Sequence, residues 1–176
     1  ILARYAIPPE RVLAHSDVAP LRKADPGECF PWRRLHQEGI GHYVHPEPPG
    51  AGPVFGPGDS GPMVATLRRR LREYGYALAD GDGFDAEVEA VVTAFQRHFR
   101  PALVDGVADR STRVTLDRLS AGLAARRSDR FAALAARFET LELPDLGGGR
   151  RDGVPVAVPS EGSERPGAEE RQPPRN

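Results

Sequence analysis

Lysine is almost absent from this sequence: of its 24 lysine and arginine residues, only Lys23 is a lysine. Cysteine also occurs once, as Cys29, which excludes a disulfide within the chain and leaves the redox compartment open. No apolar run reaches the roughly 18 residues that a membrane-spanning helix needs, so we expect no span in this chain. Acidic and basic residues nearly cancel, to a net charge of −1, which favours neither nucleic acid nor an anionic membrane as a partner.

Proline and glycine, by contrast, are plentiful, and their clusters mark joints between parts of the chain. Residues 46–62 consist mostly of Pro, Gly and small residues, which predicts an extended linker. We expect an α/β part at 1–45, before the linker. After the linker we expect a small all-α domain at 63–121, a helical extension at 122–143 and a disordered tail at 144–176. The chain opens at Ile1 without methionine, so we expect it to be the C-terminal part of a longer protein, with any targeting segment upstream.

The first 45 residues have the pattern of the end of an α/β domain. Residues 1–5 would close a helix. The short apolar run Arg11–His15 predicts a strand that delivers His15 to the edge of a sheet. A loop over 17–27 and a short helix over 32–38 would complete this part.

Three apolar stripes at helical spacing follow the linker and predict a three-helix bundle. Their members are Val64, Leu67, Leu71 and Tyr74 in the first helix, Val88, Val91, Val92, Phe95 and Phe99 in the second, and Leu116 and Leu119 in the third. Asp85 and Asp109 each follow an Asp-Gly turn and are placed to cap the second and third helices. One more amphipathic helix is predicted over 128–141. The near absence of apolar residues from Pro144 onward predicts disorder.

The segment around Lys23 carries the residue types of a metal-dependent hydrolytic site. His15 and Asp25 are suitable zinc ligands, and a zinc hydrolase needs about three protein ligands plus a water. Lysine is a compact charge on a flexible stem that can meet a developing oxyanion, whereas arginine is a rigid fork. Spacing alone favours a simpler interpretation, in which His15 is a partly buried histidine and Asp17, Lys23 and Asp25 are solvated loop charges.

The order of residues in this segment closely resembles the C-terminal zinc-site motif of the type 2 N-acetylmuramoyl-L-alanine amidases. The matching runs are His15-Ser16-Asp17-Val18-Ala19-Pro20, Arg22-Lys23-x-Asp25-Pro26-Gly27 and Phe30-Pro31-Trp32, with Ile7–Val12 before them and Gly39–Gly41 after them. The resemblance covers about the first 45 residues. It implies that His15 and Asp25 hold zinc and that Lys23 steadies the tetrahedral intermediate.

Two departures from that family bear on activity. Leu21 stands where the family commonly has glycine, so the loop either carries strain or shifts. The family's remaining zinc-ligand histidine and its general-base glutamate come earlier in the chain, and nothing here matches them. We therefore predict that the chain as given binds zinc weakly and is inactive alone.

The other polar residues have simpler interpretations. We expect Asp17, a rival ligand to Asp25, to cap its own loop, Cys29 to be a small packed residue, and Trp32 to lie in the core. The remaining histidines have no matching context and are not assigned to the metal; they are His36, His42, His45 and His98. His98 is expected at the surface or rim of the bundle.

The three-helix segment resembles the peptidoglycan-binding domain type 1 family over roughly residues 58–121. The residues that carry this resemblance are Val64-x-x-Leu67-x-x-x-Leu71-x-x-x-Gly75-Tyr76, Gly83-Phe84-Asp85, Ala90-Val91-x-x-Phe95-Gln96 and Asp105-Gly106-x-x-Asp109-x-x-Thr112. A helical bundle without a ligand is the alternative for this segment.

The sequence as a whole therefore predicts a zinc-dependent N-acetylmuramoyl-L-alanine amidase. It would hydrolyse the amide between N-acetylmuramic acid and L-alanine in peptidoglycan or muropeptide fragments, in the cell envelope or periplasm, with a cytoplasmic location left open. One alternative is a non-catalytic peptidoglycan-binding or scaffolding protein, and another is a different zinc amidase or peptidase acting on muropeptides.

Overall fold

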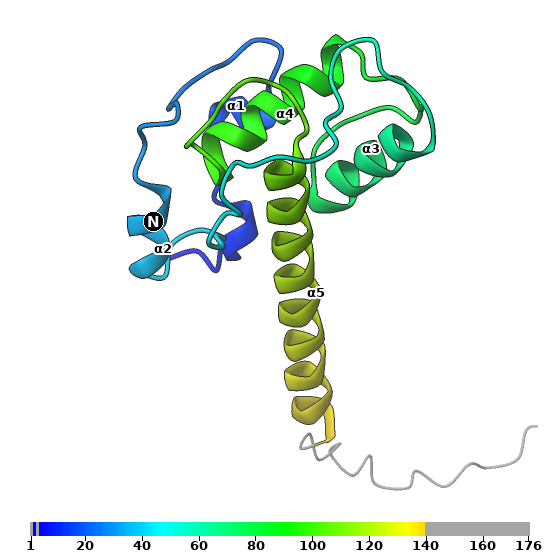
Figure 1. Cartoon of the computed structure of the whole chain (residues 1–176). Helices are drawn as coiled ribbons and strands as arrows, with labels where there is room; N and C mark the ends of the chain where they lie inside the picture. Colours follow the sequence, from blue (N-terminus) through cyan, green and yellow to red (C-terminus); the bar gives the residue numbers. More distant parts are fainter. Residues whose placement is uncertain (1, 3, 140–176) are drawn as a thin grey trace, which may run out of the picture. The chain divides into compact units, whose positions relative to one another are not determined.

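The computed structural model describes residue 2 and residues 4–139, and every regular element in that range is helical. The elements, in chain order, are the 3-10 helix η1 (Pro9–Arg11) and the α-helices α1 (His15–Val18), α2 (Trp32–Gln37), α3 (Pro62–Tyr74), α4 (Ala86–Phe99) and α5 (Arg110–Glu139) (Figure 1). Within this range, Ser60 and Gly83 form an isolated antiparallel bridge. The tail predicted at 144–176 lies outside the described residues. None of the helices in the described part is long and apolar enough to cross a membrane.

The three predicted helices form the bundle and are confirmed as α3, α4 and the first half of α5. α3 starts at Pro62, in the first-turn position where proline suits a helix, and stops at Gly75, whose φ of 137° favours glycine. The helices pack around one apolar core, whose buried members are Val64, Leu67, Leu71, Tyr76, Leu78, Phe84, Val88, Val91, Val92, Ala94, Phe95, Phe99, Ala108, Leu116 and Leu119. Tyr74 is only partly buried and packs against that core.

Both predicted aspartate caps are present. Asp85 Oδ1 accepts a hydrogen bond from the Val88 N–H at 2.9 Å and so satisfies one free donor at the start of α4. Asp109 Oδ1 accepts from both the N–H and the hydroxyl of Thr112, each at 2.7 Å. Asp109 therefore satisfies a free backbone donor at the start of α5.

The helical extension is a continuation of α5: residues 128–139 are helical, as predicted, but they belong to α5 rather than to one more helix, and residues 140–143 lie outside the described residues. α5 runs for 30 residues without a break, because no proline interrupts it and the single glycine, Gly122, is tolerated. A side chain at Gly122 would come within 3.3 Å of His42 Nε2, so the glycine leaves room for that ring. Figure 1 shows the C-terminal half of α5 running past the other helices.

The predicted α/β remnant is not found, and the strand predicted over Arg11–His15 is wrong. η1 ends at Arg11, the next three residues have no regular structure, and His15 opens α1. A strand needs ladder hydrogen bonds from a neighbour, and no described segment pairs with these residues. The Asp17 carboxylate instead accepts the Ala14 N–H at 2.8 Å, which turns the chain into a helical turn. The short helix predicted over 32–38 is confirmed as α2.

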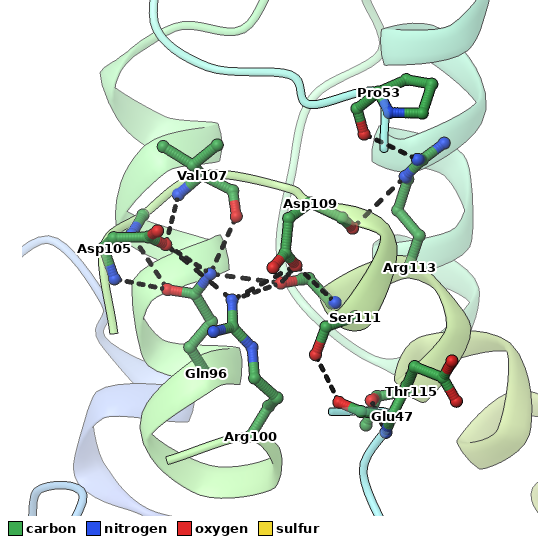
Figure 2. Close-up of polar contacts among 12 residues, drawn as sticks. Glu47, Pro53, Gln96, Arg100, Asp105, Val107, Asp109, Ser111, Arg113 and Thr115 are labelled. Atoms are coloured by element: carbon green, nitrogen blue, oxygen red, sulfur yellow. Dashed lines mark hydrogen bonds and ion pairs between the residues drawn. The ribbon is translucent and has the colours of Figure 1, made fainter. Parts of the chain in front are cut away.

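The Pro/Gly segment contains no helix before Pro62, and it is fastened to the bundle along much of its length. The backbone of Glu47 bonds the start of α5 through Thr115 and Ser111 (Figure 2). Further along, Phe55 and Ala108 exchange both backbone hydrogen bonds, at 3.3 and 2.8 Å. The segment is therefore a strap across α5 in this structure.

Candidate functional site

The structure brings His15 and Asp25 together. His15 Nδ1 lies 2.6 Å from Asp25 Oδ2, at hydrogen-bonding distance, and the ring donates because an ionised carboxylate can only accept. A backbone hydrogen bond from the Ser16 N–H to the Asp25 carbonyl, 3.1 Å long, closes the same loop. Both side chains face solvent, with 72% and 58% of their surface exposed. Asp17, the alternative ligand to Asp25, does not lie beside His15 and Asp25.

Lys23 lies in the loop between the two and is exposed. The hydrogen bond from His15 is the main cause that lowers the pKa of Asp25, and the charge of Lys23 lowers it further. Asp25 is therefore held as a carboxylate, the form that a metal requires. Leu21 causes no backbone strain here, because no described residue other than glycine has a positive φ.

Asp17 is turned into the bundle, and it bonds a nearby backbone N–H, as expected, but it caps the helical turn α1 rather than the loop predicted over 17–27. Its carboxylate is 4% exposed and accepts three hydrogen bonds, from the Ala14 N–H, the Tyr76 hydroxyl and His98 Nδ1, at 2.8, 2.8 and 2.6 Å. A buried carboxylate whose lone pairs are taken by three donors is a poor metal ligand. Asp17 serves as the link between α1 and the bundle.

His98 is buried at 2% exposure, so the prediction of a surface or rim position is wrong. Its ring is stacked between Trp32 and Phe99, with centroid distances of 3.7 and 3.8 Å. Trp32 is itself 7% exposed, which confirms it as a core residue. The polar partner of His98 is Asp17, 81 residues away, and no local pattern in the sequence announces that contact.

The remaining candidates do not join the pair. His42 is buried, and that burial lowers its pKa to about 4. Its Nδ1 lies 3.0 Å from the Tyr74 hydroxyl. Cys29 is exposed rather than packed, contrary to the prediction. Among the described residues, no group of three or more His, Cys, Asp or Glu side chains could hold a metal ion.

A cleft of about 370 Å³ lies where the N-terminal segment meets the bundle. Its walls combine cationic, aromatic and acidic side chains from both sides, among them Arg11, Leu13 and Asp17 on one side and Tyr74, Tyr76 and Arg127 on the other. Leu13 and Asp17 flank His15 in the chain. The cleft lies beside the segment that carries the pair.

Residues 60–116 match the family model described as "Putative peptidoglycan binding domain", which confirms the resemblance of the helical segment. N-acetylmuramoyl-L-alanine amidase AmiD of Escherichia coli (strain K12) is 43% identical over 124 residues, which are 68% of this chain and 43% of that protein. The chain is similar to N-acetylmuramoyl-L-alanine amidases. The 1,6-anhydro-N-acetylmuramyl-L-alanine amidase AmpD of Enterobacter cloacae is 44% identical over 36 residues, 20% of this chain and 19% of that protein.

Two solved structures share the fold over about two thirds of this chain. The complex of Escherichia coli AmiD with the substrate anhydro-N-acetylmuramic acid-L-Ala-D-gamma-Glu-L-Lys aligns with a TM-score of 0.52 at 41% identity, over 67% of this chain and 46% of that one. AmpDh3 of Pseudomonas aeruginosa, in complex with anhydromuramic pentapeptide, aligns with a TM-score of 0.56 at 33% identity, over 69% and 48%. The chain therefore spans less than half the length of the relatives it matches.

Proposed function

We propose that this chain belongs to a zinc-dependent N-acetylmuramoyl-L-alanine amidase of type 2. Residues 1–45 would supply the end of its catalytic domain and residues 63–121 a peptidoglycan-binding domain. The observation that carries the proposal is the meeting of His15 and Asp25 at 2.6 Å, with Lys23 beside them, in a chain 43% identical to an amidase.

The two proposed ligands suit zinc in their chemistry. An imidazole nitrogen and a carboxylate oxygen are common zinc donors, and here the two lie 2.6 Å apart. No described group offers three ligands, so a further ligand and the general base would come from outside the described residues.

A bound zinc ion would polarise the scissile carbonyl and lower the pKa of the attacking water. Lys23 would place its ammonium near the carbonyl oxygen, where negative charge grows as the amide carbon becomes tetrahedral. Asp25, an exposed carboxylate, would be ionised and available as a ligand at neutral pH. Together these residues support hydrolysis of the amide between N-acetylmuramic acid and L-alanine.

The helical domain would hold the enzyme on its substrate, peptidoglycan or muropeptide fragments of it. Such a domain raises the local substrate concentration without adding a catalytic contact. The strap formed by residues 46–62 supports a fixed placement of this domain beside the catalytic segment. A protein that acts on peptidoglycan would work in the cell envelope or periplasm.

The test is zinc analysis and hydrolysis of a soluble muropeptide by the full-length protein, by its Lys23→Ala variant and by the 176-residue chain. We expect peptide release by the full-length protein, with kcat about 10²–10³-fold lower in Lys23→Ala and zinc content unchanged, as for the loss of one oxyanion donor. The 176-residue chain should bind substoichiometric zinc and release no peptide. A full-length protein that binds peptidoglycan but releases no peptide would instead be a non-catalytic wall-binding protein.

A further inference from the structure

The helical turn that carries His15 depends on the bundle for its position. α1 has four residues, far fewer than the roughly 12–15 at which an isolated helix becomes marginally stable. Among them the structure buries Ser16 and the Asp17 side chain. Asp17 receives two hydrogen bonds from the bundle, from Tyr76 after α3 and from His98 in α4. These two donors fix α1 against the helices.

His98 also contacts the segment that follows Asp25. Trp32, seven residues after Asp25, opens α2 and stacks on the His98 ring at 3.7 Å with an interplanar angle of 23°. One buried imidazole therefore touches the chain at two points, at Asp17 between the two candidate ligands and at Trp32 after them. Neither contact is local in sequence, so both depend on the folded bundle.

The two candidate ligands make few contacts of their own. His15 and Asp25 are mostly exposed, and within the part of the chain that the structure describes the hydrogen bond they share is the only one that either forms with another side chain. An exposed side chain with one contact takes its position from its backbone. The backbone here is held through Asp17 and Trp32, and therefore through His98 and Tyr76.

We propose that His98 and Tyr76, which belong to the helical bundle, are positioning residues for the metal ligands: through Asp17 and Trp32 they hold His15 and Asp25 beside each other. The inference rests on the proposed function. It gives the peptidoglycan-binding segment a second role, because part of the support of the metal site comes from a domain similar to a wall-binding module. Partners that orient metal ligands typically change metal affinity or activity by 10–100-fold when they are removed.

The experiment measures zinc affinity by competition with a chelator, and kcat and KM on a soluble muropeptide, in the full-length protein. Tyr76→Phe removes only the hydroxyl that bonds Asp17 and keeps the ring in the core. Its matched control is Tyr74→Phe in the same bundle. This substitution removes a hydroxyl that is hydrogen-bonded to His42. His98→Ala removes both contacts, and His98→Asn restores an N–H donor near the position of Nδ1 without the stacked ring.

We expect the zinc Kd to rise several-fold in Tyr76→Phe and about 10–100-fold in His98→Ala, with kcat falling and KM unchanged. His98→Asn should recover part of the loss, and Tyr74→Phe should match the wild type. Wild-type Kd and kcat in both Tyr76→Phe and His98→Ala would overturn the inference alone, as would an equal effect of Tyr74→Phe. A wild-type protein without zinc or activity would overturn the proposed function and the inference together.

Discussion

The backbone N–H of Glu47 donates to the Thr115 hydroxyl at 3.0 Å, a contact that joins the Pro/Gly strap to the start of α5 across 68 residues of sequence. The Glu47 carboxylate also pairs with Arg110 and with Arg118, the latter at 2.7 Å. The hydrogen bond from Arg110 is the main cause that lowers the pKa of Glu47. One residue therefore fastens the strap through its backbone and through its side chain.

Glu47→Ala should loosen the strap while leaving the bundle folded. Amide hydrogen exchange in residues 47–55 should become roughly 3–10-fold faster, because two ion pairs are lost and the backbone hydrogen bonds remain. The natural control is Glu73→Ala, which removes a pair with Arg69 in which both side chains are more than half exposed. Exchange that is unchanged in Glu47→Ala would show that the backbone contacts alone hold the strap.

Gln96 is the polar centre of the bundle, and its loss should be costly. Its side-chain oxygen accepts the N–H groups of Asp105 and Gly106 at 3.0 and 2.9 Å, and its amide donates to the Val107 carbonyl (Figure 2). Gln96→Leu would leave two backbone donors without a partner, at about 1–3 kcal/mol for each one buried. We expect the free energy of unfolding to fall by about 2–4 kcal/mol in urea titrations.

A surface glutamine provides the comparison for Gln96. Gln37, at the end of α2, is exposed, and Gln37→Leu should change stability by less than about 0.5 kcal/mol. Equal effects of the two substitutions would mean that water replaces Gln96 as the partner of the turn.

Acid should destabilise the chain through His42. Burial lowers its pKa from 6.5 to about 4, so between these values the unfolded state binds one more proton than the folded state. This contribution to stability is present above pH 6.5 and is lost as the pH falls toward 4, by on the order of 1–2 kcal/mol after solvent screening. Thermal unfolding from pH 7 to pH 4 should show this loss, and His42→Gln should show a smaller one. The same slope in His42→Gln would assign the effect to other groups.

The bundle could be predicted from the sequence because its signals are local. The apolar stripes and the caps at Asp85 and Asp109 act within a few residues, and the structure places them as expected. Local signals could not decide whether residues 11–15 form the predicted strand, because a short apolar run forms a strand only beside a partner. The burial of His98 could not be predicted for a related reason: it depends on Asp17 and Trp32, and both lie far away in the sequence.

In the candidate site, too, the local contact could be predicted from the sequence and the long-range contacts could not. The meeting of His15 and Asp25 follows from a loop of ten residues and a motif that could be recognised, so it was predictable. The contacts of the strap with α5, and those of α1 with the bundle, could not be predicted, because the partners of Glu47 and Asp17 lie 59 to 81 residues away. In this chain, contacts between residues far apart in the sequence determine how the parts are joined.

Replacing the single lysine by the residue that the rest of the chain prefers tests its role most sharply. Lys23→Arg keeps the positive charge but exchanges a compact ammonium for a wide planar group with different donor directions. If Lys23 stabilises an oxyanion, kcat of the full-length protein on a soluble muropeptide should fall about 10-fold or more, with zinc content and KM unchanged. Arg22→Lys, at the neighbouring exposed position, is the control and should behave as the wild type. Full activity in Lys23→Arg would mean that charge alone matters at this position, and a drop in zinc content would mean that the residue acts by holding the loop.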